Sequence, residues 1–451
     1  MVPLAMLLMM AGTEMLLGYQ DPAPAAPAAV SPVSFKNDIA RILQEQCVAC
    51  HGPKKAEGGY RVDTFTKLSL AGDSGVEPLV ASQADKSELV RRLITEDTAE
   101  RMPEGGERLA DSQIELMKRW VSEGASYDGA SREENIATLI PPTQYAPPPE
   151  HYPLAIPVTA VTWSAAGDAV VAAGYHELTI WNPADGSLIR RIANLPQRIH
   201  AIRWHPDGKH LVVAGGSPGR IGEVRVVNYE TGEVSRVLPR NSDVILDIAF
   251  SPDGTRLATA GADAMIRIYD MTTDGTPTTQ VYSSHSDWVY SIAWSADGKR
   301  LASASRDKTA KFFDIEKSEL LLTYSGHAAP VRGVSFSPNG AEVYSVGADH
   351  KVQRWKTENA QKSGEFGTGG ESLRCGSVAG LCWVAGANKQ VRLYDMEKSA
   401  ELRTLSGHSD WVLAADVHLG SNRVVGSSHS GELIVWNKDD GAIISRWYAK
   451  P

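Results

Sequence analysis

The chain has 451 residues, of which 42% are hydrophobic and 22% are charged. These proportions are typical of folded proteins and exclude disorder throughout, and the length predicts two or three domains. The formal net charge is −9 and the sequence has no stretch of clustered Lys and Arg, whereas a nucleic-acid-binding surface must neutralise phosphates. We therefore expect no nucleic-acid partner.

Residues 1–30 begin with an apolar run from Val2 to Ala11 and continue with an Ala/Pro-rich segment. An apolar run of about ten residues followed by small residues is typical of a secretory signal. No Lys or Arg precedes the run, so an uncleaved N-terminal anchor and a buried helix stay open as alternatives. We expect an exported protein, periplasmic or in an equivalent compartment, which contacts a membrane only through such an anchor.

Residues 31–127 are expected to fold as a small helical domain. Apolar residues at helical spacing from Phe35 to Leu43 predict a helix that runs directly into Cys47. A second, amphipathic helix is predicted from Asp111, the N-cap candidate, to a stop at Gly124.

Two thiols and an imidazole lie close together at Cys47, Cys50 and His51. Thiols three positions apart on one helical turn match the vinyl groups of one haem, and a His directly after the second Cys lies beneath the iron. Zinc needs further Cys or His ligands nearby, yet the next His is His151. A thioredoxin-like disulfide needs a βαβ surrounding, which the sequence does not indicate. The motif thus favours one covalently attached haem c, with zinc and a redox disulfide as alternatives.

A low-spin electron carrier needs a second axial ligand, which is usually a methionine. Between residues 31 and 150 the only methionines are Met102 and Met117. Met102 precedes Pro103 in a loop, where its side chain is free to reach a haem face, whereas Met117 lies on the amphipathic helix and is expected to fill the core. We predict His51 and Met102 as the axial ligands, with an open iron site as the alternative.

Residues 128–154 lose apolar periodicity and accumulate proline, which predicts a linker or a clamp over a neighbouring surface. From 155 to 451 the sequence repeats itself in seven units with a period of about 39 to 46 residues. Each unit alternates apolar strands with turns, such as Pro252-Asp253-Gly254, in which glycine supplies the positive φ of a tight hairpin.

The helical region resembles the planctomycete-type cytochrome c domain over about residues 33–127, because the Cys-x-x-Cys-His motif, the loop Met-Pro and the Trp-bearing helix occur in that order. The resemblance implies a small all-α, class I-like cytochrome fold in which Cys47, Cys50, His51 and Met102 hold the haem.

The repeats resemble WD40 repeats, because one unit carries Gly326-His327 with Asp349 and Trp355, and the last carries another Gly-His with a Trp. This resemblance implies an all-β, seven-bladed propeller of four-stranded blades. In that family a His, a Ser or Thr, an Asp and a Trp form a buried network within a blade. Only the unit 325–357 is expected to keep it, with Ser345 as the fourth member. Residues 442–448 are expected to supply the last blade's own fourth strand.

Two further residue pairs stand out in the repeats. Cys375 and Cys382 are expected to face each other across a hairpin centred between Val378 and Ala379, either as a disulfide or as two buried thiols. Trp288 and Trp411 are expected in loops on the top face, where they either anchor a partner or pack over the next blade.

From these patterns we expect an exported c-type cytochrome that transfers single electrons, with no catalytic residue. Its propeller is expected to act as an interaction platform for a redox protein or complex. Two alternatives stay open: an oxidoreductase whose propeller carries a second cofactor, and a haem-based redox or gas sensor, which needs Met102 to be absent from the iron.

Overall fold

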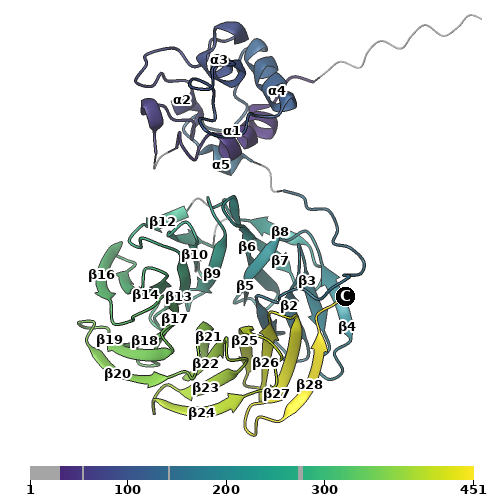
Figure 1. Cartoon of the computed structure of the whole chain (residues 1–451), viewed down its shortest axis with the longest axis vertical. Helices are drawn as coiled ribbons and strands as arrows, with labels where there is room; N and C mark the ends of the chain where they lie inside the picture. The colour runs from purple at the N-terminus through teal and green to yellow at the C-terminus, as the bar shows by residue number, and fades with distance from the viewer. Residues whose placement is uncertain (1–30, 53–54, 141–142, 273–277) are drawn as a thin grey trace, which may run out of the picture.

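The structure is a computed structural model, and it describes residues 31–52, 55–140, 143–272 and 278–451. A small helical domain is followed by a large ring of β-sheets (Figure 1). The predicted signal or anchor, residues 1–30, lies outside the described residues. Within the described part of the chain, no helix is long and apolar enough to cross a membrane.

The helical domain is built from short helices. They are η1 (Phe35–Ile39), α1 (Ala40–Gln46), η2 (Glu57–Gly59), α2 (Phe65–Leu68), η3 (Ala84–Lys86), α3 (Glu88–Ile94), α4 (Asp111–Ser122) and α5 (Ile136–Leu139). The predicted helix before the cysteines is confirmed, because η1 and α1 follow each other directly and Cys47 is the C-cap of α1. At the centre of the core, the rings of Phe35 and Phe65 meet edge to face at 5.1 Å, and Trp120 packs 5.5 Å from Phe35.

The predicted amphipathic helix is α4. Its buried residues are Ile114, Met117, Trp120 and Val121, as the apolar spacing predicts. Gly124, at a φ of +106°, follows its end. The N-cap prediction was wrong by one residue: the N-cap is Ala110, whose backbone N–H donates to the side chain of Gln113 at 3.2 Å, so that Asp111 is the first helical residue.

The ring contains seven four-stranded antiparallel sheets, and within each sheet the strands are neighbours in chain order. Blades 1 and 2 consist of β1 (Val161–Trp163), β2 (Val170–Ala173), β3 (Leu178–Trp181), β4 (Leu188–Ile192), and of β5 (Arg198–Trp204), β6 (His210–Ser217), β7 (Ile221–Asn228), β8 (Val234–Val237). Blades 3 and 4 consist of β9 (Ile245–Phe250), β10 (Arg256–Gly261), β11 (Ile266–Asp270), β12 (Thr278–Tyr282), and of β13 (Val289–Trp294), β14 (Arg300–Ser305), β15 (Ala310–Asp314), β16 (Glu319–Tyr324).

Blades 5 and 6 consist of β17 (Val331–Phe336), β18 (Glu342–Gly347), β19 (Lys351–Lys356), β20 (Lys362–Gly367), and of β21 (Ser372–Val378), β22 (Leu381–Gly386), β23 (Val391–Asp395), β24 (Ala400–Leu405). Blade 7 consists of β25 (Val412–His418), β26 (Arg423–Ser428), β27 (Glu432–Asn437) and β28 (Ile443–Tyr448). The seven-bladed prediction is confirmed, and so is the prediction that blade 7 takes its fourth strand from residues near the C-terminus.

The predicted hairpin turns have a clear chemical cause. In the turn at Asp253-Gly254, the carboxylate of Asp253 accepts hydrogen bonds from the Ser251 hydroxyl at 2.5 Å and from the Thr255 N–H at 3.1 Å. Gly254 has a φ of +71°, which residues with a Cβ adopt reluctantly. Side chains on both faces of the sheets then pack against the neighbouring blades, so the core is divided among the seven inter-blade seams.

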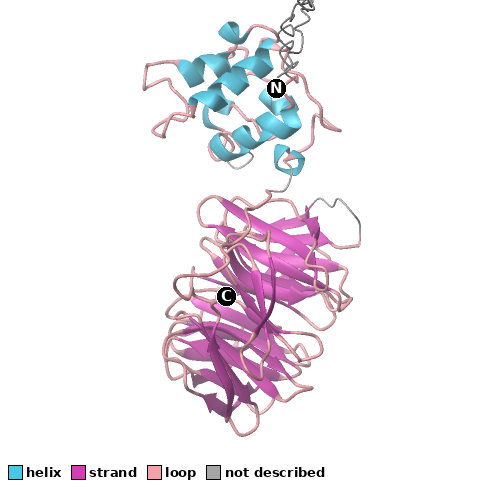
Figure 2. Cartoon of the chain, turned by 90° about the vertical axis from the view of Figure 1, so that its right-hand side faces the viewer, coloured by secondary structure: helices cyan, strands magenta, loops and turns pink. Residues whose placement is uncertain are grey.

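The helical domain lies beside the rim of the ring in both views (Figures 1 and 2). From residue 143 the chain runs along the outside of blades 2 and 1 before it enters β1 (Figure 1). Within the Pro-rich segment 128–154, α5 packs in the helical core, whereas Tyr145 and Tyr152 contact Glu223 and Glu177 of the propeller.

Candidate functional site

The sequence motif Cys47 to His51 forms one turn at the end of α1. The backbone N–H groups of Cys50 and His51 both donate to the carbonyl oxygen of Cys47, at 3.2 Å and 2.9 Å. Cys47 packs against the helical core, Cys50 is exposed and His51 is half-buried. The fold thus brings both thiols and the imidazole onto one turn at the edge of the domain.

The ring of His51 is oriented by Tyr60. The Nδ1 atom of His51 lies 3.3 Å from the carbonyl oxygen of Tyr60, and the two rings meet edge to face with centroids 5.6 Å apart. Tyr60 is held in turn, because its phenol donates to the Leu68 carbonyl at 3.0 Å. When Nδ1 donates to a carbonyl, Nε2 keeps its lone pair, which is the tautomer that binds a metal.

These donors fit a haem c. Two sulfurs are available for thioethers, and one oriented imidazole nitrogen is available for iron. Burial, with a smaller effect of the Cys50 sulfur, raises the pKa of Cys47 to about 12, so this thiol is protonated at neutral pH. Among the described residues, no three His, Cys, Asp or Glu side chains gather as a metal site.

Met102 lies in a loop that is fastened to α3. Its backbone N–H donates to the carbonyl of Arg92 at 2.9 Å. The guanidinium of Arg92 donates to the carbonyl of Glu100, two residues before Met102, at 3.3 Å, and that of Arg91 donates to the Glu100 carboxylate at 2.6 Å. These contacts fix the loop backbone and leave the Met102 side chain half-buried. Met117 is 1% exposed within the core, so the prediction that it fills the core is confirmed.

Blade 5 contains the complete network that the repeat motif predicts. The Nδ1 atom of His327 lies 2.9 Å from the Asp349 carboxylate, and Nε2 lies 2.8 Å from the hydroxyl of Ser345. The indole N–H of Trp355 donates to the same hydroxyl at 3.2 Å. Ser345 is therefore the fourth member, as predicted.

Blade 4 contains a network that the sequence reasoning missed. His285 lies 2.8 Å from Asp307 through Nδ1 and 2.7 Å from the hydroxyl of Ser303 through Nε2. A Ser precedes this His in place of the usual Gly, which concealed the motif. The spacing was an available signal, because His285 and Asp307 are 22 positions apart, as are His327 and Asp349.

The prediction that Cys375 and Cys382 face each other directly was wrong. Cys375 pairs with Val384 and Cys382 pairs with Ser377, so the cysteines are diagonal neighbours. The reason is the turn, which is Ala379-Gly380 with positive φ at both residues and therefore lies one residue later than expected. Both thiols are free and buried, and a hydrogen bond with Cys382 together with burial raises the pKa of Cys375.

Arg374 reaches across the middle of the propeller. It extends from β21 of blade 6 across the ring, where its guanidinium contacts Asp247 of blade 3 at 3.2 Å. It also donates to the carbonyl of His200 in blade 2. Arg203 contacts the same Asp247 carboxylate at 2.9 Å. The middle of the ring is thus crossed by an ion-paired side chain of the protein itself.

Trp288 and Trp411 are exposed, at 40% and 51%. The guanidinium of Arg306 lies over the Trp288 ring at 5.1 Å, and His429 lies 6.0 Å from the Trp411 ring. Both indoles lie at the entry to the first strand of their blade, as predicted, and both present aromatic area to solvent.

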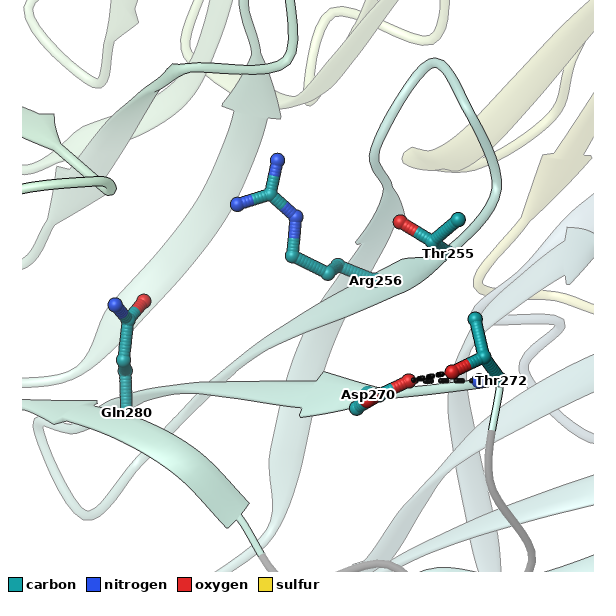
Figure 3. Close-up of a pocket in the computed structure, with 5 residues that line it drawn as sticks. All are labelled: Thr255, Arg256, Asp270, Thr272 and Gln280. Carbon is teal, nitrogen blue, oxygen red and sulfur yellow. Dashed lines mark hydrogen bonds between the residues drawn. The ribbon is translucent and has the colours of Figure 1, made fainter.

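A separate hollow of about 450 Å³ lies at blade 3 (Figure 3). Its lining is Thr255, Arg256, Asp270, Thr272 and Gln280. The Asp270 carboxylate accepts hydrogen bonds from both the N–H and the hydroxyl of Thr272, while Arg256 donates to the Gly298 carbonyl at 2.7 Å. These groups already have partners within the fold, so they do not define a ligand site.

A helical domain with a Cys-x-x-Cys-His turn, followed by a propeller with buried His, Asp and Ser networks, defines a cytochrome c-type domain joined to WD40 repeats. Residues 47–105 match the family model described as planctomycete cytochrome C. The WD domain, G-beta repeat, matches residues 232–270, 276–314, 318–356 and 399–437. The chain thus contains a planctomycete cytochrome C domain and a WD40 propeller.

Curated relatives are similar to this chain over part of its length. The anaphase-promoting complex subunit cdh1 of Dictyostelium discoideum is 27% identical over 62% of this chain and 36% of its own length. The ribosome biogenesis protein YTM1 of Phaeosphaeria nodorum is 31% identical over 26% of each chain. Cell division cycle 20.6, a cofactor of the APC complex in Arabidopsis thaliana, is 21% identical over 62% of this chain and 58% of its own. The chain therefore spans less than two thirds of each of these proteins.

Proposed function

We propose that this protein is an exported c-type cytochrome that carries single electrons at one haem c, and that its propeller docks it to a redox partner. The observation that carries the proposal is the turn at the end of α1, with two free sulfurs and an imidazole whose Nδ1 faces the Tyr60 carbonyl. Haem c supplies a one-electron Fe(III)/Fe(II) couple when it is bound.

The residues around this turn support a haem. Cys47 and Cys50 would hold the porphyrin through thioethers, and His51 would hold the iron through Nε2. Met102, with its loop backbone fixed on α3, is the proposed second axial ligand.

The propeller contributes a surface for the partner. Trp288 and Trp411 expose rigid aromatic rings to solvent. Tryptophan is among the residue types most enriched at the positions that contribute most to binding energy in protein interfaces. Arg374 reaches across the middle of the ring and is already paired with Asp247 and the His200 carbonyl, which supports the binding function over an enzyme with a second cofactor there.

The test is expression of the exported protein with haem-maturation machinery, followed by denaturing gel staining for covalent haem. Cys47→Ser together with Cys50→Ser should abolish the covalent haem, and His51→Ala should retain thioether-linked haem with altered spectra. Cys375→Ser is the matched control and should leave covalent haem unchanged. A wild-type protein that carries no covalent haem after coexpression would refute the proposal.

The axial ligand and the partner surface have separate tests. Met102→Ala should remove the far-red Met-to-iron band of the oxidised protein, whereas Met117→Leu should retain it. Persistence of that band in Met102→Ala would disprove the ligand assignment. Crosslinking in the exporting cell should recover a redox protein with the wild type and recover less with Trp288→Ala and Trp411→Ala; equal recovery would assign the partner to another surface.

A further inference from the structure

Three blades place a buried glutamate at the same position, at the start of the third strand or directly before it. The three positions are equivalent in the strand register. Glu177, Glu223 and Glu432 each lie four residues before the third-strand residue that pairs with Val170, Leu211 or Val424 of the second strand. Their exposures are 0%, 0% and 2%. A carboxylate so far from water requires partners, because an unpaired buried charge is costly.

In blade 7 the partner is the repeat's own histidine. The Nδ1 atom of His408 lies 3.0 Å from the Glu432 carboxylate, and the backbone N–H of Ser409 donates to the same oxygen at 3.1 Å. Blades 1 and 2 have no Gly-His in their sequence, so their glutamates need another donor.

The Pro-rich segment supplies that donor twice. The phenol of Tyr152 donates to Glu177 at 2.6 Å, and the phenol of Tyr145 donates to Glu223 at 2.7 Å. Tyr152 is buried and Tyr145 is half-buried. Two tyrosines from outside the repeats therefore occupy the role that His408 has in blade 7.

Arginines of the same blades hold the backbone of the segment. Arg191, paired with Glu177 at 2.6 Å, donates to the carbonyls of Pro149 and Glu150 at 2.8 Å and 2.9 Å. Arg225, which lies 3.3 Å from Glu223, donates to the carbonyl of Thr143 at 2.7 Å. Its guanidinium also lies over the Tyr145 ring at 4.8 Å.

The segment continues across the seam between blades 1 and 7. The N–H of Tyr152 donates to the carbonyl of Pro451 at 3.4 Å, and that of Val158 donates to the Ser428 carbonyl at 3.2 Å. The hydroxyl of Ser427 returns a hydrogen bond to the Val158 carbonyl at 3.0 Å. No strand is shared between the first and last described sheets, so these contacts supplement side-chain packing at the point where the ring closes.

At its other end the segment meets the helical domain. The guanidinium of Arg41, on α1, donates to the Thr143 hydroxyl at 3.2 Å. Arg240 of the propeller donates to the same hydroxyl. One residue of the segment thus bridges the helix that leads to Cys47 and the charged cluster of blade 2.

We infer that residues 143–158, here called the clasp, are a structural part of the propeller that completes blades 1 and 2, fastens them to blade 7 and seats the helical domain at the rim. The two domains consequently move as one body, and the helical domain keeps a fixed position relative to the propeller faces. This inference does not depend on haem, since it rests on contacts of the polypeptide alone.

Hydrogen–deuterium exchange of the full-length protein tests the clasp. In the double variant Tyr145→Phe, Tyr152→Phe both phenol donors are lost and the rings are kept. Amides of residues 143–158 and of β3 and β7 should exchange about tenfold faster, as expected for the loss of hydrogen bonds to a charged group. Amides of α4 should keep their rates. Tyr448→Phe, at a 51% exposed tyrosine of β28, is the matched control and should change nothing.

Small-angle X-ray scattering of the same proteins reports whether the helical domain keeps its position against the propeller. The double variant should show a larger radius of gyration and a longer maximum dimension than the wild type and Tyr448→Phe. If the double variant does not fold, each single Tyr→Phe variant provides the same measurements. Unchanged exchange in residues 143–158 together with unchanged scattering would overturn the inference, while a normal haem content in these variants leaves the proposed function intact.

Discussion

His285 contacts Asp307 at 2.8 Å in blade 4, and one blade later His327 contacts Asp349 at 2.9 Å in the same arrangement. In both blades the second ring nitrogen meets a serine hydroxyl, so the imidazole is satisfied at both ends. A buried ring that is bonded on both sides fixes the loop before the first strand against the second strand of its blade and the turn that follows it.

Asp307→Ala should therefore destabilise the protein. The change leaves the buried Nδ1 of His285 and the hydroxyl of Thr309 without the acceptor that they use, at 2.8 Å and 2.6 Å. The expected loss is about 1–3 kcal/mol of unfolding free energy, measured by urea denaturation. Glu316→Ala, at an exposed ion pair with Lys299, is the control and should cost under about 0.5 kcal/mol. Equal midpoints for the two variants would mean that the network of blade 4 is dispensable.

Gly426 of blade 7 stands where Ser345 stands in blade 5. A Cβ at this position would lie 2.9 Å from Nε2 of His408 and 2.8 Å from the ring of Trp436. Gly426→Ala should thus overpack the blade and lower the unfolding free energy by about 1–3 kcal/mol. The control is Gly364→Ala on β20, whose Cβ would have no neighbour closer than 3.7 Å. A neutral Gly426→Ala, measured by thermal unfolding, would show that the His408 ring moves aside freely.

The stability of the propeller should fall in mild acid. Burial, with Arg374 and Arg198 nearby, lowers the pKa of His200 to about 4, and burial also lowers the pKa of His327. An unfolded His titrates near pH 6.5, so between pH 6.5 and 4 the unfolded chain binds more protons than the native protein. Stability is therefore full above pH 6.5 and declines as the pH falls toward 4.

The contribution of His200 to this loss of unfolding free energy can be measured. His200→Gln should reduce the loss between pH 7 and pH 4 by about 2–3 kcal/mol, after allowance for its own effect at pH 7. The unfolding free energies come from urea titrations at both pH values. His151→Gln, which replaces an exposed His, should leave the pH dependence as in the wild type. Identical slopes for all three proteins would assign the acid sensitivity to other groups.

The parts that could be predicted from the sequence are those whose chemistry lies in adjacent residues. Cys47, Cys50 and His51 are neighbours on one turn, and the Asp-Gly turns repeat with the period of a blade, so both the turn and the ring follow from local patterns. The fourth strand of blade 7 followed from the same repeat, because residues 442–448 lie at the distance from the third strand that other blades share.

The parts that could not be predicted depend on contacts between distant residues or on one-residue choices of a turn. The register of β21 and β22 depends on the turn at Ala379-Gly380, whose centre lies one residue later than expected. Cys375 and Cys382 are therefore diagonal neighbours and not a directly facing pair. The pairing of Tyr152 with Glu177 joins a linker to a blade 25 positions later, and no repeat or spacing signals it.

The loop that carries Met102 should respond to Arg92. This residue holds the loop through its carbonyl, which accepts the Met102 N–H at 2.9 Å, and through its guanidinium, which donates to the Glu100 carbonyl at 3.3 Å. Arg92→Gln should loosen the loop and weaken the Met-to-iron band of the haem-loaded protein, with a lower reduction potential. Arg108→Gln, at an exposed pair with Asp111, is the control. An unchanged band and potential in Arg92→Gln would show that the guanidinium does not position the methionine.

Arg374 is expected to be the most costly propeller residue to replace. Its guanidinium joins blade 6 to Asp247 and to the carbonyl of His200 across the channel, and Asp247 is 3% exposed. Arg374→Ala leaves a buried carboxylate with Arg203 as its remaining cation, 2.9 Å away, so the loss should be about 3–5 kcal/mol of unfolding free energy. The double variant Arg374→Met, Asp247→Asn removes both charges and should recover part of this loss, because the buried side chain that has lost its Arg374 partner is then neutral. Urea denaturation in which the double variant is less stable than Arg374→Ala would show that the two residues stabilise the ring independently, and not as an ion pair across the channel.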